Sequence, residues 1–193
     1  MTSSALTRPT TILRFTILLF SIVTIILLGL AYRLTGPAAD WEFYGDGPGR
    51  AFPAMCFAAV AWSIIWSATA VGMTLGHVDY HPGVEIGLDF LGLGFNWGFA
   101  GALISWCVYM NHTASICDED HGRYQQKYDK LCRQGKTLDG LEYSSGAFLL
   151  LIGCCHLIIF IEACRAAHNR RIQSKQDLSI ELGQKSSNAG SGR

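Results

Sequence analysis

Long stretches without a charged side chain constrain this sequence more than any other feature. Four such runs occur in the chain of 193 residues, over residues 15–32, 51–76, 90–110 and 143–161. A helix needs about 20 apolar residues to cross the hydrocarbon core of a bilayer, and the four runs have about that length. A soluble protein of this size does not need four such runs in its core. The runs therefore predict an all-α membrane protein, a bundle of four antiparallel transmembrane helices.

The polar segments around these runs set the expected boundaries. We expect spans at about 12–32, 51–76, 84–110 and 143–164, within a four-helix domain that covers residues 11–166. The first span is predicted to be a retained helix, because its apolar run is longer than that of a signal peptide. A polar N-terminal tail covers residues 1–10, and residues 111–142 are expected to form a soluble loop. The C-terminal tail, 167–193, is rich in serine and glycine near its end and is predicted to be disordered.

The glycines of the third span are not scattered. Gly87, Gly94, Gly98 and Gly101 fall on one side of a helix, and Gly94 and Gly98 have the spacing that lets helix backbones approach closely in lipid. Asp89 and Asn96 share the opposite side. A helix with a smooth face and a polar face is expected to have neighbours on both. The alternative, a glycine-rich segment of a soluble core, does not fit the length of the apolar run.

Ionisable side chains within the spans fall at common depths. An antiparallel order places Arg14, Asp89 and Glu162 in one leaflet. A second polar layer of Ser21, Asn96 and His156 lies about 10 Å deeper, at about 1.5 Å per residue. Charges at such depths are costly and tend to pair inside a bundle. We expect a structural charge cluster that fixes the register of the helices. A proton or ion relay through His156 is the competing hypothesis.

Two cysteines lie in the expected loop. Cys117 and Cys132 are predicted to form a disulfide, which an oxidising compartment would favour. A metal site with His121 is the alternative, but it lacks a fourth ligand. The basic residues are nearly balanced between the two sides of the membrane and do not decide the orientation. The disulfide therefore decides it, and both termini are expected in the cytoplasm.

Two modification sites are candidates in the same chain. Cys164 ends the fourth span beside basic residues, a setting in which palmitoylation occurs, although an ordinary buried cysteine fits equally well. Asn111 opens a formal glycosylation sequon, but it lies close to the end of the third span.

The sequence contains no motif of an enzyme active site. It has no P-loop, no GxSxG, no HExxH and no CxxC motif, so neither catalytic residues, a cofactor nor a metal site is expected. The formal net charge is zero, which does not favour nucleic-acid binding. A bound haem, held by histidines at matched depth, is a distant alternative because His156 alone lies well inside a span.

Five features of the sequence form a recognisable pattern. They are the hairpin with His81 and Pro82, the aromatic and glycine pattern at 88–99, the exit at 28–32, Arg14, and the basic exit at 162–165. In these features the chain resembles MARVEL-type four-helix membrane proteins, particularly fungal ones. The resemblance covers roughly residues 11–168 in architecture. It implies an M-shaped bundle with cytoplasmic termini, and it implies no catalytic residues. The cysteine pair in the second outer loop departs from that pattern.

These observations predict a non-enzymatic membrane protein that organises membrane domains or vesicle traffic. Its expected partners are membrane lipids, sterol-rich or anionic, other membrane or trafficking proteins, and further copies of itself. The plasma membrane or endomembrane vesicles are the expected location. The alternative is a small transporter or channel subunit with a polar path through Asp89, Asn96, His156 and Glu162.

Overall fold

The computed structural model describes residues 4–34, 51–76, 78, 82–114 and 125–190. These residues form four α-helices and no strand: α1 (Ser4–Leu34), α2 (Ala51–Leu75), α3 (Pro82–Ala114) and α4 (Gln125–Gly190). Each helix contains a segment long and apolar enough to cross a membrane: Pro9–Leu34, Ala54–Leu75, Pro82–Val108 and Gly135–Gln176. The all-helical class and the four membrane-spanning candidates are thus confirmed.

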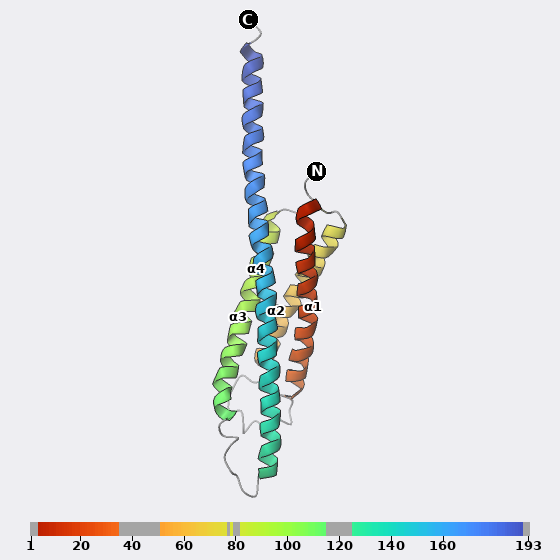
Figure 1. Ribbon diagram of the computed structural model, residues 1–193, viewed down its shortest axis with the longest axis vertical. Helices are drawn as coiled ribbons and strands as arrows, with labels where there is room; N and C mark the ends of the chain where they lie inside the picture. Colours follow the sequence, from red (N-terminus) through yellow and green to blue (C-terminus); the bar gives the residue numbers. More distant parts are fainter. Residues whose placement is uncertain (1–3, 35–50, 77, 79–81, 115–124, 191–193) are drawn as a thin grey trace.

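The four helices lie side by side along the long axis of the molecule (Figure 1). The start of α1 and the end of α4 lie at the same end of the molecule, and α4 projects far beyond the other helices there. Helix α1 packs against α2 and α4, and α3 packs against the same two helices, with its larger contact on α4. Every helix therefore has two neighbours, and the four enclose one interior.

Helix α4 is much longer than the span predicted from sequence at 143–164. It begins at Gln125, inside the predicted loop at 111–142, and it ends at Gly190, inside the tail that composition predicted to be disordered. No proline follows Pro82, and α4 is rich in alanine, leucine, glutamine and lysine, which favour helices. A polar composition shows that a segment cannot build a core, but it does not prevent the segment from continuing a helix.

The interior holds two clusters of buried apolar side chains. One joins all four helices through Leu28, Cys56, Ala59, Val60, Ala100, Leu103 and Leu149. The other joins α1 and α4 through Ile17, Ile152, Cys155 and Ile159. Large apolar side chains such as Phe15, Ile65 and Phe90 are more than half exposed on the outside. An apolar exterior around a packed interior is what lipid contact requires.

The predicted glycine face of α3 does not pack against another described helix. Gly87, Gly94, Gly98 and Gly101 are exposed, and an added Cβ at any of them would meet no atom within 4 Å. The close approaches occur at other glycines, because α3 and α4 meet through different sides. A Cβ on Gly146 would lie 2.8 Å from the Ile104 side chain, and one on Gly153 would overlap the Trp97 ring.

Candidate functional site: a buried polar network

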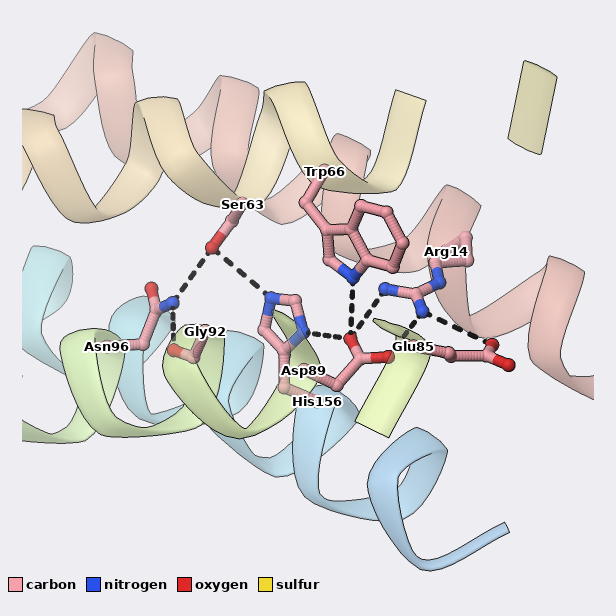
Figure 2. Close-up of polar contacts among 8 residues, drawn as sticks. All are labelled: Arg14, Ser63, Trp66, Glu85, Asp89, Gly92, Asn96 and His156. Carbon is pink, nitrogen blue, oxygen red and sulfur yellow. Dashed lines mark hydrogen bonds and ion pairs between the residues drawn. The ribbon is translucent and has the colours of Figure 1, made fainter. Parts of the chain in front are cut away.

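The Asp89 carboxylate lies at the centre of a network of polar side chains inside the bundle (Figure 2). Arg14 of α1 donates two hydrogen bonds to it, from Nη1 to Oδ1 at 2.6 Å and from Nη2 to Oδ2 at 2.5 Å. The side chains of Arg14 and Asp89 are 3% and 0% exposed. This two-bond geometry is the strongest form of carboxylate recognition available to a side chain.

Two further helices donate to the same carboxylate. Trp66 Nε1 of α2 lies 3.1 Å from Asp89 Oδ1, and His156 Nδ1 of α4 lies 2.8 Å from that oxygen. The Arg14 guanidinium also sits over the Trp66 ring, 5.1 Å from its centroid, as a cation–π contact. One side chain of α3 thus receives hydrogen bonds from α1, α2 and α4, which fixes the depth of all four helices relative to one another.

His156 extends the network deeper into the bundle. Because the Asp89 carboxylate can only accept, the His156 nitrogen facing it, Nδ1, must carry a proton. The other nitrogen, Nε2, lies 3.3 Å from Ser63 Oγ. Asn96 Nδ2 donates to Ser63 Oγ at 2.8 Å and to the Gly92 carbonyl at 2.7 Å. These contacts link α2, α3 and α4 by hydrogen bonds at this depth.

Helical spacing explains how the local sequence places these groups. Asp89, Gly92 and Asn96 are three and four residues apart, so they share one face of α3. Ser63 and Trp66 are three apart and share one face of α2. A Cβ on Gly92 would lie 2.9 Å from the His156 ring, so the glycine leaves the space that the imidazole occupies.

The structure brings together four of the five residues of the predicted cluster. Arg14, Asp89, Asn96 and His156 belong to one network, but Glu162 does not. Its carboxylate pairs instead with Arg165, three residues on, at 3.0 Å on the surface of α4. Leaflet depth alone does not determine which side of a helix a residue occupies, and Glu162 lies on an outer side of α4.

Three members of the network were not predicted as site residues. Ser63 and Trp66 lie on α2, and Glu85 Oε1 lies 3.5 Å from Arg14 Nη2 at the half-buried edge of the site. The i, i+4 spacing of Glu85 and Asp89 was a signal that could have indicated Glu85. Serine and tryptophan are common in packed membrane helices, so their types alone gave no such signal.

The contacts from Ser63 through His156 to Asp89 follow the order of a serine hydrolase triad. All three side chains are completely buried, however, and the Ser63 oxygen also accepts a hydrogen bond from Asn96. Asp89 is moreover paired with Arg14. In this arrangement the hydroxyl is held within the network rather than presented to a substrate, so the contacts serve to join helices.

A second buried polar group lies toward the other end of the bundle. Glu142 of α4 is 4% exposed, and its Oε2 lies 3.4 Å from Cys107 Sγ of α3. Sequence reasoning placed Glu142 at the end of a loop, whereas it lies within the apolar segment of α4. Along the helices, Val60, Leu103 and Leu149 lie between the two polar sites. We call these three residues the apolar layer.

The remaining predicted sites are only partly within the described residues. Cys117 and His121 lie outside them, so the Cys117–Cys132 disulfide stays a prediction. Asn111 is in the last turn of α3, and its side chain lies outside the described set. Cys164 is free and half-buried. Among the described residues, no three histidine, cysteine or acidic side chains are grouped so as to hold a metal ion.

Comparisons of the chain with protein-family models, curated proteins and solved structures found no match. The resemblance to MARVEL-type proteins therefore stays a hypothesis based on the segments named above.

Proposed function

We propose that this chain is a multi-pass membrane protein that organises membrane domains or vesicle traffic, in the manner of MARVEL-type proteins. In this proposal the four helices cross the membrane as an antiparallel bundle with both termini in the cytoplasm. The observation that carries it is the Asp89 network. Its ionisable groups form hydrogen bonds and ion pairs with one another, and these contacts join four helices, as expected of a structural scaffold.

The surface of the bundle supports a role in contacts within the membrane. The face of α3 that carries Gly94 and Gly98 is exposed, and close by on that helix Phe90 and Trp97 are exposed as well. A smooth apolar face of this kind suits contact with lipid or with another membrane helix, including a second copy of the chain.

The cytoplasmic end suits anionic lipid. Arg165, Arg170, Arg171 and Lys175 are all exposed on α4, at or just beyond the apolar part of the helix. Basic residues beside a membrane surface attract anionic lipid by about 1 kcal/mol each. This end of α4 would therefore favour membrane regions that are rich in such lipid.

Purification in native-lipid discs tests the proposal. We expect a colourless, metal-free preparation that carries characteristic lipids together with trafficking or membrane-domain proteins. Replacing Gly94 and Gly98 by leucine should release these partners, whereas His156→Gln, which keeps hydrogen-bonding capacity, should retain them. A Soret band, a stoichiometric metal or one co-purified transporter would contradict the proposal.

A small transporter or channel subunit is the second candidate. The observation that favours it is the continuous series of polar contacts from the half-buried Glu85 through Asp89 and His156 to Asn96. The apolar layer interrupts this series before it reaches Glu142. Ion or proton flux into proteoliposomes that His156→Gln abolishes, and that the glycine replacements leave unchanged, would establish this candidate over the organiser.

A further inference from the structure

Glu142 is a buried acid that takes no part in the Asp89 network. It lies fourteen residues before His156 on α4, which at about 1.5 Å per residue places it about 21 Å away along the helix. Its one hydrogen bond within the described structure is with the Cys107 thiol, at 3.4 Å. The hydroxyl of Ser145, three residues later on α4, donates its hydrogen bond to the Leu141 carbonyl of the same helix and not to Glu142.

The described groups around Glu142 offer no positive charge. Among the described residues, no lysine, arginine or histidine forms an ion pair with it. The Glu142 carboxyl interacts with the Cys107 thiol of α3 through a hydrogen bond and with Asp139 of its own helix electrostatically. It also interacts electrostatically with the Cys56 thiol of α2. These groups are neutral or negative, and a thiol is a weak hydrogen-bond donor.

A carboxylate in such a place is unfavourable. A buried charge loses its hydration energy, and without a counter-ion or strong donors little of that energy is recovered. A carboxyl group in such a place takes up a proton and becomes neutral instead. Asp89, which is just as buried, has the Arg14 guanidinium and two further donors, whereas Glu142 has a single thiol. The two buried acids therefore differ in the counter-ion and the donors available to them.

We propose that Glu142 is held as a neutral carboxylic acid and forms a proton-binding site in the half of the bundle away from the chain termini. Asp139, half-buried, precedes Glu142 by three residues on the same helix. It lies between this site and the end of the bundle at which α4 begins, which we call the loop end. The apolar layer separates the Glu142 site from the Asp89 network. Its proton therefore exchanges with the compartment that the loop end faces, and this inference does not depend on a role in membrane organisation.

Loss of this proton has a structural consequence. It leaves a negative charge between α3 and α4, beside Asp139 and with no cation paired to it in the part of the chain that the structure describes. The contact between these helices, the larger of the two that α3 makes, should then weaken at the loop end. The site thus couples the acidity of one compartment to the packing of two helices.

Infrared spectroscopy of the full chain in lipid tests the proposal directly. A protonated carboxyl has a carbonyl stretch that is separate from the bands of a carboxylate. We expect this band near neutral pH in the wild type and in Asp139→Asn, and we expect its loss in Glu142→Gln. An unchanged carboxyl band in Glu142→Gln, with loss of carboxylate intensity instead, would overturn the proposal.

A variant that keeps the acid covers the case in which Glu142→Gln does not assemble. Cys107→Ala removes the thiol but leaves the carboxyl in place, so its carbonyl band should move to higher frequency and should persist. A band that neither moves nor changes in intensity in Cys107→Ala would show that the signal belongs to another carboxyl and would overturn the proposal.

The pH dependence of unfolding gives an independent measurement. An exposed glutamate in the unfolded chain has a pKa of about 4.3. If the folded chain holds a proton that the unfolded chain releases, the free energy of unfolding falls as pH rises above that pKa. We expect this slope in the wild type and in Asp139→Asn, and a reduced slope in Glu142→Gln. Equal slopes in all three proteins would overturn the proposal.

Discussion

The ion pair between Arg14 and Asp89 allows the structural interpretation of the network to be tested with numbers. Replacing Asp89 by leucine removes the acceptor of the two Arg14 hydrogen bonds and of those from Trp66 and His156. It also deprives the Arg14 guanidinium, 3% exposed, of its buried counter-ion and leaves it the longer contact of 3.5 Å with the half-buried Glu85. Breaking one partner of a buried ion pair costs about 3–5 kcal/mol. We expect Asp89→Leu and Arg14→Met each to destabilise the bundle by about that amount.

The double variant gives the sharper result. With both charges removed, neither member of the buried pair is left without the other, and apolar side chains of similar volume replace the pair at little cost. The Trp66 and His156 donors still lose an acceptor, which costs about 1–3 kcal/mol. Arg14→Met with Asp89→Leu should therefore be less destabilised than either single variant, and the cycle should give a coupling energy of about 3 kcal/mol or more.

Reversible unfolding in mixed micelles, followed by tryptophan fluorescence, measures all four proteins of the cycle. The exposed pair of Glu162 and Arg165 is a matched control, because the side chains are 37% and 71% exposed. Its cycle should give about 0–1 kcal/mol. Additive losses at Arg14 and Asp89 would refute the structural interpretation, as would normal stability of Asp89→Leu accompanied by loss of an ion-dependent activity.

Three further substitutions, and Gly94→Ala as a control, test the packing in and around the network. Gly92→Ala should destabilise the bundle by about 1–3 kcal/mol, because its Cβ would lie 2.9 Å from the His156 ring, while Gly94→Ala, which meets no atom within 4 Å, should be neutral in the same unfolding assay. Ser63→Ala should cost about 1–3 kcal/mol, since His156 and Asn96 both lose a partner; a loss below about 0.5 kcal/mol would contradict the hydrogen-bond assignment. Gly153→Ala should cost less than Gly92→Ala by thermal denaturation, because the opposing Trp97 is 43% exposed and can move outward.

The sequence was sufficient for the parts of the fold that depend on apolar length. Runs of uncharged residues indicated the four helices, and charges at common depths indicated that Arg14 and Asp89 would meet. Both inferences rest on the free-energy cost of placing polar groups in hydrocarbon. That cost applies to each residue independently of which helices pack beside it.

The parts that depend on helix rotation were not predictable in the same way. Glu162 has the right depth for the cluster but faces outward, and Gly92 rather than Gly94 makes the close approach. The loop and tail boundaries of α4 also failed, because polarity indicates where a helix leaves the membrane and not where it ends. Glu142 was placed in a loop for that reason, and its burial could be recognised only from the packing.

The continuity of α4 gives the molecule a mechanical property. At about 1.5 Å per residue, its 66 residues extend for about 99 Å, several times the thickness of a bilayer core. Glu142 and His156 lie on this one rod, on opposite sides of the apolar layer, and the projecting end of α4 continues from it (Figure 1). The apolar layer separates the two polar sites, yet both are carried by one continuous helix, so a rotation or axial shift of α4 as a whole would move both. Because α4 is continuous, a displacement of the helix at one membrane surface would be transmitted to the part that projects beyond the opposite surface.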